Sequence, residues 1–525
     1  MDREIVHARR WYILGVLVLS LLVVVLDNTV LNVALKTIAD PVAGLGATQS
    51  QLQWAINAYT LVFAGLLFTW GTSGDRYGRK RVLMTGFVLF GLASLASAYA
   101  RTPGELIAAR ALMGIGGAAV LPSTLSIISN VFEPRERPRA IGIWAGAVGL
   151  AIAIGPITGG LLLAHFWWGS VFLINVPIVL LGLVAIAWVV PESRDPRPGR
   201  FDPAGVALQV TGLFGVVYGI IRAGDLGTFA EGWVWASLLG GLALLLAFGW
   251  YERRSDHPAL DVRLFRDARF SAAVAAVGLT FFALMGVTFF MVFYLQVVRG
   301  YSPLHSGVLL LPLAAAQLLT APRSPALVRR FGAKVVCAGG LLLVTVAFLS
   351  FLTLGVDSNI WVLEALFFVQ GAGMGNVMAP ATESIMSALP RERAGAGAAV
   401  NNTVRQVGAA FGVAVLGTVL STSYRDRIEP VLAGLLLPPQ VGDAAAVRTA
   451  MAKSVEATYA VIERVGGPLQ MLRAPANEAF VQAMHVTAGY AAAVAFAGVL
   501  VVAAFLPGHR SPAPVGDDER LAAGA

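Results

Sequence analysis

Charged side chains are scarce in this chain of 525 residues. Asp, Glu, Lys and Arg make up 13% of the sequence, against roughly 25% in soluble domains, and the mean hydropathy is +0.74. Cysteine occurs once, at Cys337, so the chain cannot form an internal disulfide framework. These shortages exclude a soluble enzyme and a disulfide-stapled secreted domain.

Motifs for enzymatic chemistry are also missing. The six histidines are scattered without the spacing of a metal site, and no glycine-rich Walker motif with its lysine is present. We therefore expect no enzyme activity, no metal site and no cofactor. Active transport by such a chain would have to draw on an ion gradient instead of ATP.

Long apolar runs are what the sequence does contain. Each is about 20 residues or longer, which is enough to cross a bilayer, and the runs lack the alternating polarity of barrel strands. They predict an all-α polytopic membrane protein with fourteen transmembrane helices. The predicted spans are 11–35, 51–70, 81–100, 104–129, 139–163, 167–190, 204–222, 232–250, 269–298, 304–322, 334–354, 360–387, 397–422 and 483–506.

Arg and Lys concentrate in every second loop, which predicts the orientation of the chain. If the N-terminus is cytoplasmic, the inner loops are rich in basic residues, while the short outer loops hold only Lys36, Arg101, Arg222 and Arg299. The pattern favours a multi-pass protein of the inner (cytoplasmic) membrane with both termini inside. The net charge of +8 is then a topology signal, and we expect no nucleic-acid partner.

An internal repeat predicts the domain organisation. Near the ends of the fourth and twelfth spans, Pro122 and Pro380 open similar segments, and each is followed by the same Pro-Arg-Glu-Arg run. The repeat predicts two parallel six-helix bundles with a substrate site between them. We expect an N-terminal bundle at 1–190, a linker with two extra transmembrane helices at 191–268, and a C-terminal bundle at 269–525 with a long extracytoplasmic segment around 423–482.

Ionisable side chains inside the spans are the candidate coupling residues. Asp27 is the only acid near the middle of any span, and a bare carboxylate there costs roughly 2.5–3.5 kcal/mol on insertion scales. Arg110 lies about 9 Å inside the outer end of its span. Glu364, about one turn inside the outer end of its span, is either a solvated interface carboxylate or a second acidic site for cationic cargo. Arg405 is interpreted as a charge partner within the second half.

The loop at residues 71–81 carries the first family resemblance. Its glycines allow a tight turn, and its aspartate can face an arginine across the loop or a helix N-terminus. The run resembles the loop signature of the major facilitator superfamily, in which this loop gates the cytoplasmic side by locking the two halves together. The resemblance assigns that gating role to Gly71, Asp75, Arg76, Gly78 and Arg79.

The fifth predicted span carries a second resemblance. Gly155 and Gly159 at four-residue spacing permit close helix packing, and Pro156 permits a kink. On chemistry alone, ordinary packing would explain these residues. Together with Gly160 they also resemble the family's Gly-Pro-x-x-Gly-Gly motif, which is typical of antiporters and therefore implies export instead of uptake.

Three further stretches narrow the resemblance to the fourteen-span drug:proton antiporter group. Residues 26–35 resemble its first-span signature, although Lys36 replaces the usual proline, and residues 168–178 and 397–417 resemble its spans six and thirteen. Arg110 lies in a stretch that resembles a family motif associated with proton coupling. The resemblance implies the major facilitator fold, with two six-helix bundles plus two extra helices.

These observations together predict a transporter. We expect a proton-coupled antiporter that exports lipophilic, cationic drugs by alternating access, with proton and cargo competing for the charge of Asp27. The expected partners are a drug-like small molecule, protons and the lipid bilayer. The alternatives are a dedicated exporter of a single endogenous metabolite or antibiotic, an uptake symporter, and a non-transporting scaffold or sensor.

Overall fold

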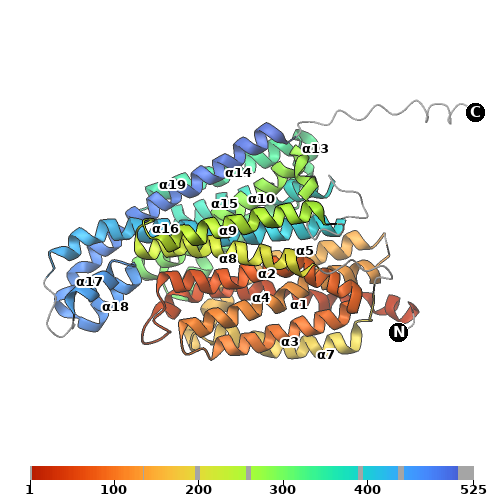
Figure 1. Cartoon of the computed structure of the whole chain (residues 1–525), viewed down its shortest axis with the longest axis horizontal. Coiled ribbons are helices and arrows are strands. Elements are labelled where there is room, and N and C mark those ends of the chain that lie inside the picture. The colour runs from red at the N-terminus through yellow and green to blue at the C-terminus, as the bar shows by residue number, and fades with distance from the viewer. Residues whose placement is uncertain are drawn as a thin grey trace, which may run out of the picture.

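The computed structural model describes residues 3–133, 135–194, 202–255, 262–387, 394–435 and 443–506. Within these ranges the chain forms helices joined by short loops, without a strand. The long helices run roughly parallel to the long axis of the molecule (Figure 1). The prediction of an all-α membrane protein is therefore confirmed.

The first bundle is built from the N-terminal part of the chain. Its helices are α1 (Arg3–Ala39), α2 (Gln49–Tyr77), α3 (Arg79–Ala98), α4 (Pro103–Val131), α5 (Arg137–His165), α6 (Ser170–Leu173) and α7 (Asn175–Val189). The hydroxyls of Thr48 and Thr102 cap the N-termini of α2 and α4 by accepting backbone hydrogen bonds. Gly78 separates α2 from α3, and its φ of 114° is a conformation that favours glycine.

Two further helices, α8 (Pro203–Leu226) and α9 (Gly232–Arg254), form a hairpin beside the bundles. Helix α8 packs against α2 of the first bundle and against α16 (Ala394–Ala433) of the second. Helix α9 packs mainly on α8, and its tryptophans Trp233, Trp235 and Trp250 remain exposed. An apolar face of this kind suits contact with lipid.

The second bundle contains the remaining long helices. Its elements are η1 (Val262–Arg266), α10 (Ala268–Phe293), the π turn η2 (Tyr294–Val298), α11 (Pro303–Leu309), α12 (Leu311–Thr320), α13 (Ser324–Phe331), α14 (Ala333–Ser350), η3 (Phe351–Thr353), α15 (Ile360–Ser387), α16 and α19 (Arg473–Phe505). The predicted span 304–322 is not continuous, because the helix breaks at Leu310. Pro312 accounts for the break, since proline has no N–H to donate to the preceding turn and its ring crowds the carbonyl four residues earlier.

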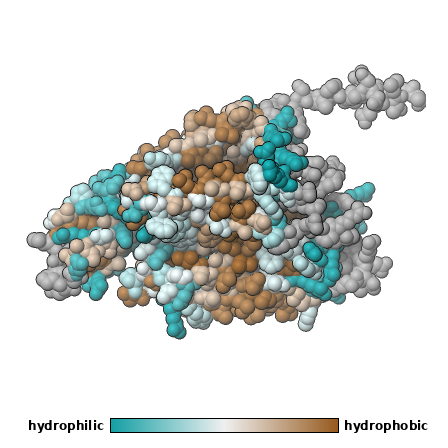
Figure 2. All heavy atoms as spheres, in the orientation of Figure 1, coloured by the Kyte–Doolittle hydropathy of each residue, from teal (hydrophilic) through white to brown (hydrophobic). Residues whose placement is uncertain are grey.

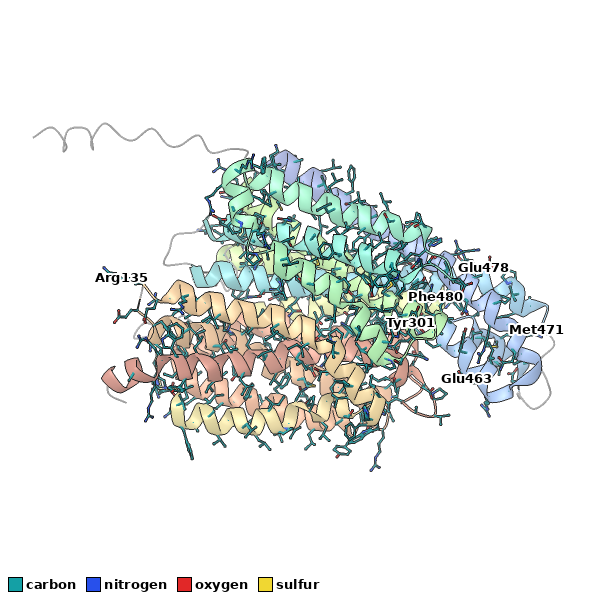
Figure 3. All side chains as sticks on the ribbon, turned by 180° about the vertical axis from the view of Figure 1, so that it is seen from behind. Arg135, Tyr301, Glu463, Met471, Glu478 and Phe480 are labelled. Atoms are coloured by element: carbon teal, nitrogen blue, oxygen red, sulfur yellow. The ribbon has the colours of Figure 1, made fainter. Side chains whose placement is uncertain are left out.

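The segment between α16 and α19 is a helical cap. It consists of α17 (Ala444–Met451), α18 (Val455–Val465) and η6 (Gly467–Leu472). The cap lies at one end of the molecule, which we call the distal end, and the start of α1 and the end of α19 lie at the other, the terminal end (Figure 1). Figure 3 shows Glu463 and Met471 in the cap, far from Arg135 at the terminal end.

On the face shown in Figure 2, an apolar band crosses the middle of the molecule, and hydrophilic surface lies toward both ends. Thirteen helical stretches among the described residues are long and apolar enough to cross a membrane. The one predicted span outside these thirteen is the fifth, 139–163, which lies on α5, where the described apolar stretch Ile154–His165 is shorter. The chain is therefore a multi-pass membrane protein, consistent with the predicted count of fourteen helices.

Two side-chain hydrogen bonds join the bundles at the distal end. The Gln296 side-chain amide donates to the backbone oxygen of Val33 at 3.0 Å, and that of Gln49 donates to the backbone oxygen of Gly417 at 3.5 Å. From there the bundles diverge toward the terminal end (Figure 1). The repeated Pro-Arg-Glu-Arg run at 390–393, residue 134 of the first copy and the C-terminal residues 507–525 lie outside the described residues.

Candidate functional site

Asp27 and Arg110 form a buried ion pair between α1 and α4. The side chain of Asp27 is 1% exposed and that of Arg110 is fully buried. One guanidinium nitrogen of Arg110 donates to Oδ2 of Asp27. A buried charge costs several kcal/mol without a partner, so each group makes the other tolerable in this position.

The remaining surface of the Arg110 guanidinium is also occupied. Its Nε donates to the backbone oxygen of Ala55 on α2 at 3.1 Å, and Nη2 lies 3.5 Å from Oδ1 of Asn28. The ring of Tyr59 lies under the guanidinium, with 4.4 Å between the guanidinium carbon and the ring centre. Ion pair, hydrogen bonds and cation–π contact therefore satisfy this arginine within the first bundle.

Asn175, the first residue of α7, completes the site. Its side-chain amide donates to Oδ1 of Asp27 at 3.0 Å and lies 3.0 Å from the hydroxyl of Ser94, which in turn donates to the backbone oxygen of Phe172. Asn175 is fully buried. Asn175 is not among the residues predicted from the sequence, although an amide in an otherwise apolar span is a usable signal for a buried polar contact.

The four predicted coupling residues do not form one cluster. The structure brings Asp27 and Arg110 together, whereas Glu364 is half-buried near the distal end of α15. Arg405, on α16, lies over the ring of Phe281 at 4.6 Å. No ion pair links Arg405 to a carboxylate of the described residues, so the expected charge partner is not found in that part of the chain.

The predicted gating loop packs on its own bundle. Arg79 pairs with Asp75 at 2.8 Å, and the backbone N–H of Arg79 donates to the oxygen of Ser193 at 3.0 Å. The Lys80 ammonium donates to the Ala187 oxygen at the end of α7. Gly71 lies against Pro122 of α4, and the side chain of Arg76 is exposed. These contacts tie the α2–α3 turn to α4 and α7, within the first bundle.

The glycine-rich face of α5 meets both α1 and the second bundle. A Cβ added at Gly155 would overlap Thr29 of α1, and one added at Gly159 would crowd Val30. A Cβ at Gly160 would overlap the backbone of Leu304 on α11, and Pro156 lies against Gly307 of that helix. The absence of side chains thus permits the backbone contact that joins the bundles at the distal end.

One carboxylate outside the membrane spans has an unusual environment. Glu456 lies in the first turn of α18 in the cap, where burial raises its pKa from an ordinary value to about 7. The hydroxyl of Ser454 and the charge of Lys36 oppose this rise. Glu456 as a whole residue is only half-buried.

Related proteins agree with this architecture. The chain is 38% identical to the multidrug efflux pump LfrA of Mycolicibacterium smegmatis over 438 residues, which cover 83% of this chain and 86% of that protein. It is 36% identical to the methyl viologen resistance protein SmvA of Salmonella typhimurium, over 80% of this chain and 84% of that protein. It is 33% identical to the tetracenomycin C resistance and export protein of Streptomyces glaucescens, over 96% and 94%.

A solved structure shares the fold. A bacterial homologue of the human lysosomal transporter Spinster superposes with a TM-score of 0.65 at 18% identity, over 96% of this chain and 99% of that one. The profile described as "Major Facilitator Superfamily" matches residues 17–413. The paired bundles, the distal contacts and these similarities lead to one assignment: the chain belongs to the Major Facilitator Superfamily.

Proposed function

We propose that the chain is a proton-coupled antiporter that exports lipophilic drugs, cationic ones among them, across the cytoplasmic membrane. Its relatives at 33–38% identity are named for multidrug efflux, methyl viologen resistance and tetracenomycin C export, which supports drug export as the function of this chain. The charge pattern of the loops supports a cytoplasmic terminal end and an external distal end. In that orientation the distal contacts close the external side.

The proposed transport cycle moves two bundles, 1–190 and 269–525, against each other. The connecting part, 191–268, would act as a linker. Distal contacts such as Gln296 with Val33 would have to break when the external side opens. The turn at residues 71–81 would then lock the cytoplasmic side. This is the alternating-access motion of transporters with two repeated bundles.

The buried pair of Asp27 and Arg110 carries the proposal of proton coupling. A proton delivered from the external side would neutralise Asp27 and remove its ion pair with Arg110. Arg110 would keep its contacts with Ala55 and Tyr59 but lose its counter-ion, so the arrangement of α1 and α4 becomes less favourable. Release of the proton to the cytoplasm would restore the pair.

Competition between proton and cargo is proposed to be indirect in this conformation. The Asp27 carboxylate is 1% exposed, with Arg110 on one oxygen and Asn175 on the other. A cationic drug would compete with Arg110 for that charge only after the pair separates. The coupling proposal therefore requires Asp27 to be ionisable but does not require it to touch the cargo.

Ethidium transport into everted membrane vesicles tests the proposal. We expect wild-type protein to accumulate ethidium when a proton gradient is applied and to stop when a protonophore is added. Asp27→Asn should lose this proton-driven accumulation, because the amide cannot ionise. Asp40→Asn makes the same change just after α1 on the distal side and should transport normally. Wild-type rates in Asp27→Asn would refute the assignment of Asp27.

A dedicated exporter of one endogenous antibiotic is the second candidate. It is favoured by the tetracenomycin C export protein, whose similarity covers 96% of this chain and so extends through the cap. Growth assays with a panel of unrelated toxic compounds separate the two candidates. Resistance to several chemical classes supports a multidrug exporter, whereas resistance to a single compound supports the dedicated exporter.

A further inference from the structure

Arg405 is a charged side chain that the proposed coupling mechanism does not use. It lies on α16, half-buried, about 12 Å inside the predicted start of its membrane span at residue 397. Among the described residues it takes part in no ion pair. Helix α10, which it contacts, contains no Asp or Glu, and the acids of α16 lie near its distal end, at Asp426 and Glu429.

The Arg405 guanidinium points into the membrane instead of back toward the terminal end. The backbone of α16 touches α10 at Gly408 with Gly278 and at Gly412 with Phe282, so the two helices run in parallel with a constant register. By that register Phe281 lies about 9 Å further toward the distal end than the Arg405 backbone. Because the guanidinium lies over Phe281, Arg405 is not a snorkelling residue.

The surroundings of this guanidinium satisfy it only in part. Arginine stays protonated in proteins, and its guanidinium presents five N–H donors in a planar fork. Within the described part of the chain, the guanidinium makes a cation–π contact with the ring of Phe281 and donates no hydrogen bond, which leaves the fork open there. An unpaired charge at this depth in a membrane span points to a role in function, most simply as the binding group for an anion.

The ring under the open fork belongs to an apolar stretch of α10. Phe281 and Met285 lie one turn apart on α10 and are both half-buried. Phe68 of α2, from the first bundle, packs against the same apolar cluster as Phe281. The apolar cluster that Phe281 joins therefore has contributions from both bundles, as expected for a surface that alternating access would expose and close.

We propose that Arg405 and Phe281 form a cargo-binding subsite for aromatic carboxylates. The carboxylate would accept two parallel hydrogen bonds from the guanidinium, and the aromatic part would pack against Phe281 and Met285. The inference rests on the proposed export function, to which it adds a class of acidic cargo. It also gives Arg405 a counter-ion that arrives with the cargo.

Three anthracene derivatives of nearly equal size form a matched set of probes. These are anthracene-9-carboxylate, the neutral anthracene-9-methanol and the cationic anthracen-9-ylmethylammonium. Binding of each to purified protein in detergent is measured by equilibrium dialysis, which does not depend on a proton gradient. The test therefore remains decisive if ethidium transport fails and the proposed export function is wrong.

Three variants separate the contributions that the charge of Arg405, the planar shape of its guanidinium and the ring of Phe281 make to binding. Arg405→Gln should weaken binding of the carboxylate by at least about tenfold, the worth of a charge-assisted hydrogen-bonded pair. It should change binding of the other two probes less than about threefold. Arg405→Lys should recover part of the loss, because it restores the charge but not the planar fork. Phe281→Leu should weaken binding of all three probes.

Arg254→Gln is the matched control. Arg254 also stacks on an aromatic ring, Trp250, at 4.1 Å, but it is exposed at the terminal end of α9. Its replacement should leave carboxylate binding unchanged. Unchanged carboxylate binding in Arg405→Gln would overturn the proposal, as would an equal loss for all three probes in both Arg405→Gln and Arg405→Lys. A thermal unfolding midpoint for each variant shows that it is folded when binding is measured.

Discussion

Each bundle contains an arginine within a membrane span, and the surroundings of the two arginines differ. In the first bundle, Arg110 is fully buried and is held by Asp27, a backbone oxygen and the ring of Tyr59. In the second bundle, Arg405 lies over Phe281 without a carboxylate partner among the described residues. A paired charge can act as a switch when its partner is protonated, whereas an unpaired one is available to bind an anion.

Removing each arginine gives the largest expected contrast. Arg110→Leu should lower the free energy of unfolding by about 3–5 kcal/mol, because Asp27 is left buried without its partner. Arg405→Leu should change it by no more than about 1 kcal/mol, since only a cation–π contact is lost. Unfolding in mixed detergent micelles with increasing dodecyl sulfate measures both values.

A double variant sharpens the same comparison. Asp27→Leu combined with Arg110→Leu removes both charges, so it should be more stable than Arg110→Leu alone. The destabilisation of the double variant is compared with those of Asp27→Leu alone and Arg110→Leu alone. If it equals their sum, the two charges do not interact, and the contrast with Arg405 does not hold. Neither the single nor the double variant should transport ethidium with a proton gradient.

Asn175→Leu tests how closely Asp27 is held. The change removes the donor to Oδ1 of Asp27, and leaving a buried charged oxygen unsatisfied should cost about 1.5–3 kcal/mol. Ser94→Ala is the control, because it removes a neighbour of Asn175 without touching Asp27. Equal loss of stability in the two variants would show that the amide supports general packing instead of the ion pair.

The two bundles are also expected to behave as separate bodies that touch at the distal end, where α5 packs against α11. Gly160→Ala places a methyl group against the backbone of Leu304 and should cost about 1–3 kcal/mol by overpacking. Gly142→Ala lies on the same helix with open space around it and should have little effect. We expect the first variant to lose export and to expose a cysteine at Val33→Cys to an impermeant maleimide from the distal side. Normal export and unchanged labelling would contradict this role of α5.

Glu456 gives the smallest expected effect, and it concerns a buried charge outside the membrane. Its folded-state pKa of about 7 lies above the ordinary carboxylate value, so the folded cap favours the protonated form. This contribution to stability is fully present below the ordinary pKa and is lost as the pH rises through about 7. The wild-type unfolding midpoint should therefore fall between pH 5 and pH 8 more than that of Glu456→Gln. If the unfolding midpoints of the wild type and Glu456→Gln changed with pH in parallel, this role of Glu456 would be contradicted.

Several predictions from the sequence needed no knowledge of neighbouring helices. Apolar runs of membrane length predicted the helices, since a backbone in lipid must satisfy its own hydrogen bonds. The motifs around Asp75 and Pro156 predicted the superfamily that residues 17–413 match. The break at Leu310 was not predicted, although Pro312 marks it, because proline can also be accommodated inside a membrane helix.

The sequence by itself determined that Asp27 and Arg110 are costly charges in apolar helices, because hydropathy and position along a span depend only on the residues within that span. The tertiary structure alone decided that these two charges meet, that Asn175 covers the second oxygen of Asp27, and that Arg405 faces Phe281. Helical periodicity fixes which residues of one helix share a face, but packing decides which other helix that face meets.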